Sequence, residues 1–172
     1  WSAASSTGEE AYTLGMVINE YVRQNPTLTE NYQILGTDIS TRALLEARDA
    51  IYPTSRIDDI PYEYRTRYLL SSKDSGKQLV RISPSIRNKI EFKPFNLVSE
   101  KFGYLRKFDI IFCRNVLIYF DLKTRYNVLK TLYQSLSPAG YLFIGHSETL
   151  HDIDLPFINI QPTVYTKKER VE

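Results

Sequence analysis

The sequence contains one cysteine, Cys113, and two histidines, His146 and His151, among its 172 residues. One cysteine cannot form an internal disulfide bond, and the three side chains do not make up a common metal-ligand set. Because no signal-peptide pattern is present either, the sequence predicts a cytoplasmic protein without a bound metal. No apolar run approaches the roughly 18 residues of a membrane-spanning helix, so we expect no direct insertion into a membrane.

An excess of charge of one sign is also lacking. The 22 Lys and Arg residues nearly balance the 20 Asp and Glu residues, which leaves a formal net charge of +2. A nucleic-acid-binding domain usually carries a clear basic excess, so nucleic acid is not an expected partner. With 42% hydrophobic and 24% charged residues, the composition is typical of one folded globular domain.

Segments of strand and helix spacing alternate along the chain. Helices are expected to begin near residues 10, 40 and 121. The predicted strands cover residues 32–37, 90–92, 108–113 and 141–145, and a closing hairpin covers residues 157–160 and 163–167. This order predicts an α/β fold, with a doubly wound, mostly parallel sheet and an antiparallel hairpin at its C-terminal edge.

Three local patterns make this prediction more specific. The first helix has apolar residues at helical spacing, including Leu14, Ile18 and Tyr21, which predicts an inner face along that stripe. The nearly continuous apolar run at residues 108–113 predicts a strand covered on both faces. The sequence Ser-Pro-Ala-Gly at residues 137–140 is expected to be the turn that ends the third helix.

The segment from about residue 62 to residue 87 interrupts the alternation. Two strand-like runs, residues 67–71 and 78–82, flank a turn-rich sequence, which predicts a β-hairpin inserted into a crossover. Such a segment is either a long surface connection or a platform whose exposed edge accepts a peptide strand. The pattern alone favours neither.

Ligands of doubly wound sheets bind beside the carboxyl ends of the strands. The first such turn has a single glycine, Gly8, and therefore lacks the three-glycine dinucleotide fingerprint. Glu9 and Glu10 follow it, where they would repel a pyrophosphate, although their role can also be limited to complementing the helix dipole. Asp38 ends the second strand, where nucleotide-binding folds hold ribose hydroxyls, or it is simply an acid at the start of the next helix. A positively charged nucleoside without phosphates, such as S-adenosylmethionine, fits these carboxylates.

Arg114 and Asn115 directly follow the most apolar strand, and Tyr119 lies four residues further on. An arginine at this position can hold an acidic substrate through two parallel hydrogen bonds, or it can form a structural ion pair. The sequence His146-Ser147-Glu148 has the residue types of a hydrolase, but it is not accompanied by a Gly-x-Ser-x-Gly elbow.

Four runs of this sequence resemble the CheR family, the chemotaxis receptor methyltransferases. They are residues 1–12 (WSAASSTGEEAY), 36–40 (GTDIS), 108–120 (FDIIFCRNVLIYF) and 145–148 (GHSE). The resemblance spans nearly the whole chain and implies a class I, Rossmann-like fold that uses S-adenosylmethionine and leaves S-adenosylhomocysteine. It also implies that glutamate side chains of methyl-accepting chemoreceptors receive the methyl group, with the inserted hairpin as the family's small β-subdomain.

The resemblance further implies roles for particular residues. Glu9 and Asp38 match cofactor-binding acids, and Arg114 and Asn115 match the pair beside the methionine and the reaction centre. Tyr119 matches the family's tyrosine near the transferred methyl group, so Arg114 and Tyr119 are the expected catalytic residues. Two further residues match the pair on the adenine side, Asn96 and Leu97.

The chain begins with Trp1 and has hardly any strand before the first turn, so we expect sequence upstream rather than a mature extended tail. The family's helical N-terminal domain is expected to be absent from residues 1–172, which form one methyltransferase domain. A monomer is expected. Two other functions remain open: a module that binds S-adenosylmethionine or docks a receptor without turnover, and a methyltransferase for another protein carboxylate.

Overall fold

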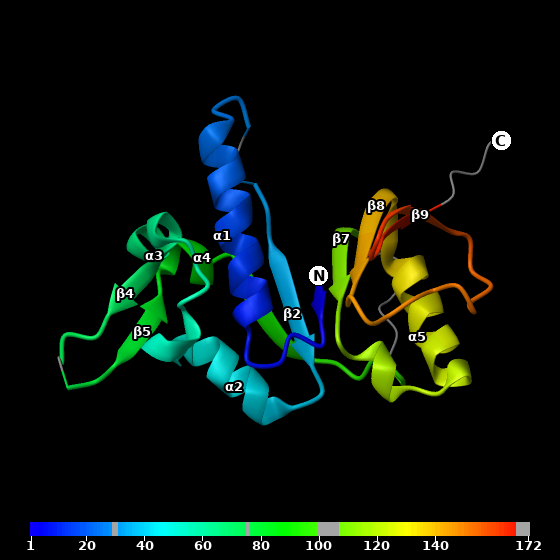
Figure 1. The fold of residues 1–172 in the computed structure, drawn as a ribbon, viewed down its shortest axis with the longest axis horizontal. Coiled ribbons are helices and arrows are strands. Elements are labelled where there is room, and N and C mark those ends of the chain that lie inside the picture. The colour runs from blue at the N-terminus through cyan, green and yellow to red at the C-terminus, as the bar shows by residue number, and fades with distance from the viewer. Residues whose placement is uncertain (29–30, 75, 100–106, 168–172) are drawn as a thin grey trace. The chain divides into compact units, whose positions relative to one another are not determined.

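The computed structural model describes residues 1–28, 31–74, 76–99 and 107–167 (Figure 1). The chain divides into two compact units, one formed by Ser5–Pro94 and the other by Trp1–Ala4 with Phe95–Glu172. We call them the 5–94 unit and the 95–172 unit and describe each by itself. Within the described residues, no helix has both the length and the apolar character that crossing a membrane requires.

The 5–94 unit combines a pair of parallel strands with a separate small sheet. Strand β2 pairs in parallel with β6, and β3, β5 and β4 form an antiparallel sheet in that order. The pairing of β4 with β5 confirms the predicted hairpin. The elements are α1 (Glu9–Gln24), β2 (Ile34–Asp38), α2 (Thr41–Asp49), β3 (Ile51–Pro53), η1 (Thr54–Arg56), α3 (Tyr62–Tyr68), β4 (Leu69–Ser71), β5 (Leu79–Ile82), α4 (Pro84–Arg87) and β6 (Ile90–Pro94).

The 95–172 unit is built on parallel strands that end in an antiparallel edge. Strands β1 and β8 each pair in parallel with β7, and β10 pairs antiparallel with both β8 and β9. The closing hairpin is therefore confirmed. The elements are β1 (Ser2–Ala3), β7 (Phe108–Cys113), η2 (Leu117–Tyr119), α5 (Leu122–Ser135), β8 (Leu136–Ile144), β9 (Phe157–Gln161) and β10 (Val164–Lys167).

The predicted fold class is confirmed. Among the described residues, the main strands of each unit pair in parallel, the C-terminal edge of the 95–172 unit is antiparallel, and three strands of the 5–94 unit form the small inserted sheet. Two helix starts are as expected, because Ser40 caps α2 through the amide of Ala43 and Asp121 caps α5 through the amide of Thr124.

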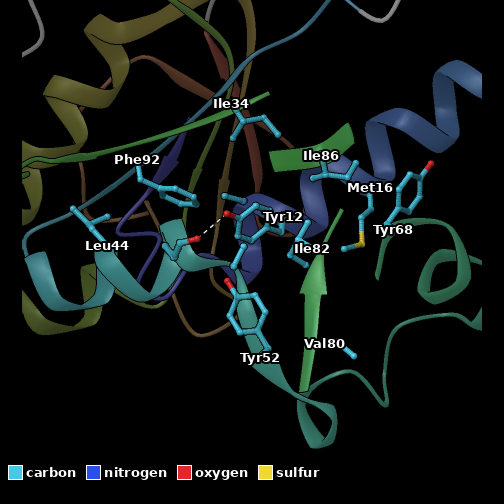
Figure 2. Close-up of a cluster of buried hydrophobic side chains, with 13 residues drawn as sticks. Tyr12, Met16, Ile34, Leu44, Tyr52, Tyr68, Val80, Ile82, Ile86 and Phe92 are labelled. Atoms are coloured by element: carbon cyan, nitrogen blue, oxygen red, sulfur yellow. Dashed lines mark hydrogen bonds between the residues drawn. The ribbon is translucent and has the colours of Figure 1, made fainter. Parts of the chain in front are cut away.

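A cluster of buried side chains joins α1 to the small sheet within the 5–94 unit (Figure 2). Tyr12 lies between the rings of Tyr52 and Phe92, with centroid distances of 6.3 and 5.6 Å. Its hydroxyl donates a 2.7 Å hydrogen bond to the carbonyl oxygen of Ala47 on α2. Burial raises the pKa of Tyr12 to about 12, so this hydroxyl remains a donor at physiological pH.

The predicted stripe of α1 is confirmed in part, because Leu14 and Ile18 are partly buried and pack against this cluster. Tyr21 is 61% exposed, whereas Tyr12, Met16 and Glu20 are buried. Helix α4 packs against α1 at Gly15, where a side chain would place its Cβ only 2.9 Å from Ile86. Glycine therefore allows α4 to approach α1 closely along the face that is buried.

Two predictions about the 95–172 unit are wrong in detail. In β7 Ile111 and Cys113 are buried, whereas Ile110 on the other face is 43% exposed, so the second face is only partly covered. Residues 137–140 belong to β8 rather than to a turn. The register between β7 and β8 shifts there, from Phe108 opposite Leu136 to Ile110 opposite Tyr141. This irregularity accommodates Pro138, because proline is tolerated in sheets at bulges.

Candidate functional site

The loop that leads into α1 has a backbone that only small residues adopt easily. Ser6 and Gly8 have positive φ angles of 49° and 94°. Two backbone hydrogen bonds close the loop. The amide of Gly8 donates to the carbonyl oxygen of Ser5, and the amide of Ser5 donates to the carbonyl oxygen of Thr37. A side chain at Gly8 would place a Cβ 2.9 Å from the Cβ of Ala47, so the chain passes too close to α2 for any larger residue.

Asp38 is the last residue of β2, and its carboxylate binds the same loop. One oxygen accepts a 2.8 Å hydrogen bond from the amide of Ser6, and the other accepts a 2.9 Å bond from the amide of Ser40. A carboxylate has about four acceptor sites, so Asp38 retains capacity for the hydroxyl groups of a ligand. The predicted acid at the end of this strand therefore lies beside the loop that enters α1.

Glu9, the first residue of α1, is bound by groups of the chain itself. The Thr7 hydroxyl donates to one carboxylate oxygen at 2.6 Å, and Arg56 of η1 donates to the other at 2.7 Å. Both charged side chains are about half exposed, at 43% for Glu9 and 53% for Arg56, so the pair is solvated and its contribution to stability is small. The Arg56 contact was not foreseen from the sequence, because 47 residues separate the partners.

A tyrosine of the small sheet also contacts this loop. The hydroxyl of Tyr52 on β3 donates a 2.7 Å hydrogen bond to the carbonyl oxygen of Thr7. Burial, as the larger cause, and the nearby negative charge of Glu9, as the smaller one, raise the pKa of Tyr52 well above its ordinary value. The hydroxyl therefore stays protonated. The loop is thus fixed from β2 by Asp38 and from β3 by Tyr52.

The remaining predicted residues lie in the 95–172 unit. Asn96 accepts a 2.9 Å hydrogen bond from the amide of Val98 through its side-chain oxygen, and Leu97 is buried. Arg114 and Asn115 directly follow β7, and Asn115 has a positive φ of 59°. Tyr119 ends η2 and is 78% exposed, so its ring is open to a ligand or a partner.

Sequence reasoning missed Glu148, which follows β8. Its carboxylate accepts hydrogen bonds from four backbone amides, those of Gly145, Asn115, Val116 and Leu117. In the sequence Glu148 stood out by its position just after a predicted strand and by its place in the family-like run 145–148, but neither signal assigned it a role. Its donors lie up to 33 residues away, and spacing along the chain does not reveal them.

The residues of the 5–94 unit fit a nucleoside without phosphates. Asp38 offers acceptors, and Arg56, the cation that contacts the start of α1, is already paired with Glu9. Among the residues that the structure describes, the buried Ser5 hydroxyl, 4% exposed, meets no hydrogen-bond partner. Glu10 adds a second carboxylate at the start of α1, beside the pair of Glu9 and Arg56, and the two acids outnumber that one cation.

An α/β fold with a carboxylate at the end of its second strand and, at the described first turn, a single glycine fits the class of S-adenosylmethionine-dependent methyltransferases. Within that class, residues 1–166 match the family described as CheR methyltransferase, SAM binding domain. The chain therefore belongs to the CheR methyltransferase family, and S-adenosylmethionine is the cofactor of this domain.

Curated relatives agree with this assignment. The chain is 43% identical over 168 residues to a chemotaxis protein methyltransferase of Borreliella burgdorferi, covering 97% of this chain and 57% of that protein. It is 34% identical over 165 residues to the chemotaxis protein methyltransferase of Escherichia coli, covering 96% and 57%. The chain thus spans somewhat more than half the length of the curated relatives that it matches.

Solved structures of other methyltransferases share the fold. The glycopeptide N-methyltransferase MtfA, complexed with sinefungin, has a TM-score of 0.51 at 11% identity, covering 98% of this chain and 51% of that chain. The methyltransferase CcbJ of Streptomyces caelestis has a TM-score of 0.52 at 12% identity, covering 83% and 43%. At such low identity these likenesses establish the fold alone.

Proposed function

We propose that this chain is the catalytic domain of a protein-glutamate O-methyltransferase that methylates chemoreceptor glutamates in chemotaxis adaptation. The match of residues 1–166 to the CheR family carries the proposal. It is supported by the names of the curated relatives, which are chemotaxis protein methyltransferases.

The residues proposed to hold the cofactor fall into two groups. In the 5–94 unit, Asp38 is proposed to accept hydrogen bonds from the ribose hydroxyls, and Glu9 to attract the positively charged methionine end. In the 95–172 unit, Asn96 and Leu97 are proposed to contact the adenine, and Arg114 and Asn115 the methionine. The spare acceptor sites of Asp38 support this role, because two backbone amides occupy only part of its carboxylate.

The reaction needs little acid–base assistance. A glutamate side chain has an ordinary pKa near 4.3 and is already ionised at neutral pH, so no general base has to remove a proton. S-adenosylmethionine, when bound, supplies a sulfonium methyl group to which a carboxylate oxygen can bond as the carbon–sulfur bond breaks. The protein must therefore bring the acceptor into line, and good positioning can lower a barrier by about 7–11 kcal/mol.

Arg114 and Tyr119 are proposed to do this positioning. The planar guanidinium of Arg114 can hold the incoming carboxylate through two hydrogen bonds, which fixes both its place and its orientation. Tyr119 is proposed to align the acceptor, and its high exposure leaves the ring accessible to a partner. Neither residue needs to carry a proton.

The partner, the location and the organisation of the protein are parts of the same proposal. Methyl-accepting chemoreceptors supply the acceptor glutamates, and the enzyme acts as a monomer in the cytoplasm. Residues 1–172 form one methyltransferase domain, and the segment at about 62–87 is its inserted β-subdomain. The near balance of charges argues against nucleic acid as a partner.

Transfer of a radiolabelled methyl group to receptor-containing membranes tests the proposal. We expect label in the receptor band that mild alkali releases, because a carboxyl methyl ester is hydrolysed by base. Binding of S-adenosylmethionine without transfer would instead indicate a sensing or docking module. Transfer to another protein, with the receptor unlabelled, would indicate a different carboxylate substrate.

A further inference from the structure

The carboxylate of Glu148 is surrounded by backbone amides from two separate loops. One oxygen accepts hydrogen bonds from the amides of Val116 and Leu117, at 3.0 and 2.8 Å. The other accepts from the amides of Gly145 and Asn115, at 2.6 and 3.2 Å. We call this arrangement the Glu148 amide cluster. It lies wholly within the 95–172 unit.

The two loops joined by the cluster follow neighbouring parallel strands. Asn115–Leu117 come after β7 and Gly145 comes after β8, and the two strands pair in parallel up to Cys113 and Ile144. The carboxyl ends of such strands are where doubly wound folds bind their ligands. Glu148 therefore fixes one loop of this edge to the next, directly after Arg114 leaves β7.

The backbone geometry of both loops is adapted to this carboxylate. Asn115 has a φ of 59°, a left-handed conformation that costs energy for a residue with a side chain. A Cβ at Gly145 would lie 2.7 Å from a Glu148 oxygen and 3.0 Å from the amide nitrogen of Asn115. Glycine at position 145 is thus required for the carboxylate to reach between the loops.

The cluster also requires a charged acceptor rather than a neutral one. Each oxygen faces two N–H donors, so both must accept, and a carboxylate is the side chain whose two oxygens both do so. In Glu148→Gln one oxygen is replaced by an NH₂ group, which would point its hydrogens at two amide donors. Hydrogen bonds from amides to a charged oxygen are also stronger than those to a neutral one.

We propose that Glu148 is a positioning residue for methyl transfer, which holds the backbone at residues 115–117 so that Arg114, Asn115 and Tyr119 can engage substrate and cofactor. The inference rests on the proposed function, since it assigns to Glu148 a part in the same site. Glu148 itself accepts only from the protein backbone and is not proposed to contact the reacting atoms.

The cluster itself is tested first, by amide hydrogen exchange on the protein and its Glu148→Gln variant. Exchange at Val116, Leu117 and Gly145 should accelerate at least about tenfold in the variant if the carboxylate protects these amides. Asp152→Asn is the matched control, because it removes a carboxylate of the same unit whose side chain is 71% exposed. Unchanged protection in Glu148→Gln would overturn the proposal.

The role in positioning is tested by kinetics against receptor membranes. Glu148→Gln should lower kcat about 10- to 100-fold, because a small displacement of Arg114 and Tyr119 disturbs the alignment of the reactants. It should also lower the affinity for S-adenosylhomocysteine. Glu148→Asp keeps two anionic oxygens on a shorter side chain and should recover part of kcat. If kcat instead follows the melting temperature across the three proteins, Glu148 has only a structural role and the proposal is wrong.

The two proposals can fail separately. If the unmodified protein does not methylate receptors, the proposed function fails. The positioning role of Glu148 can then still be tested by calorimetry with S-adenosylhomocysteine. Weaker binding by Glu148→Gln, with faster exchange in the cluster, then supports the positioning role. Equal binding by both proteins overturns it.

Discussion

The guanidinium of Arg67 on α3 binds the buried carboxylate of Glu20 on α1 at 2.7 Å, across 47 residues of sequence. Arg23 and the hydroxyl of Tyr68 bind the same carboxylate, each at 2.8 Å. Glu20 is only 3% exposed, so these three donors replace the water that the charge would otherwise attract. The cluster ties α1 to the helix that precedes the hairpin of the small sheet.

This cluster predicts a specific loss of stability in acid. The hydrogen bonds from Arg23, with those from Arg67 and Tyr68, hold the pKa of Glu20 at about 2, below its ordinary value of 4.5. Because the pKa is lowered by folding, its stabilisation is present above pH 4.5 and is lost as the pH falls toward 2. Urea unfolding from pH 7 to pH 2 should show this loss in the unmodified protein and a smaller one in Glu20→Gln. The same pH dependence in both proteins would contradict the assignment.

Gly8→Ala should destabilise the 5–94 unit. The φ of 94° disfavours any L side chain, and the new Cβ would lie 2.9 Å from Ala47 and 3.0 Å from Phe92. We expect a decrease of about 1–3 kcal/mol in the free energy of unfolding, measured in urea. Gly76→Ala is the control, because its Cβ would meet no atom closer than 3.4 Å. Equal stability of the two variants would show that the Gly8 turn is not strained.

Asp38→Asn should weaken cofactor binding. The substitution keeps the size of the side chain but removes the charge, and hydrogen bonds to charged groups contribute about 1.5–3 kcal/mol. Titration calorimetry with S-adenosylhomocysteine should show at least a tenfold weaker affinity. The exposed Asp58 provides the control variant, Asp58→Asn, which should bind normally. Unchanged affinity in a folded Asp38→Asn would remove Asp38 from the cofactor site.

Arg114→Lys should reduce turnover far more than stability. Lysine keeps the positive charge but cannot form the two parallel hydrogen bonds with a carboxylate. Arg125→Lys serves as the control, since Arg125 belongs to the same unit and pairs with Asp152. Losses of activity and of melting temperature in the same proportion would indicate that Arg114 is a structural ion-pair residue.

The features that the sequence predicted well depend on neighbours along the chain. Ser40 and Asp121 cap helices by bonding amides three residues ahead, a pattern that local sequence carries directly. The parallel fold and the place of Asp38 follow from the alternation of strands and helices. The specific roles of Arg114 and Tyr119 came from the family resemblance, and they remain predictions.

The features that were missed depend on distant contacts. By helical spacing Glu20 is expected at the surface, and its burial depends on donors from α3 as well as on Arg23 of its own helix. Likewise, the four amides around Glu148 come together only when β7 and β8 pair. The β8 irregularity at Pro138 was mistaken for a turn, because the same residues favour turns and bulges.

Peptide mass spectrometry of receptors incubated with the protein and S-adenosylmethionine tests the central claim most directly. The account predicts that glutamate side chains gain the mass of one methylene group, that mild alkali removes it, and that Arg114→Lys greatly reduces it. Receptor peptides that stay unmodified, while the protein still binds S-adenosylmethionine, would contradict the claim that this domain methylates chemoreceptor glutamates.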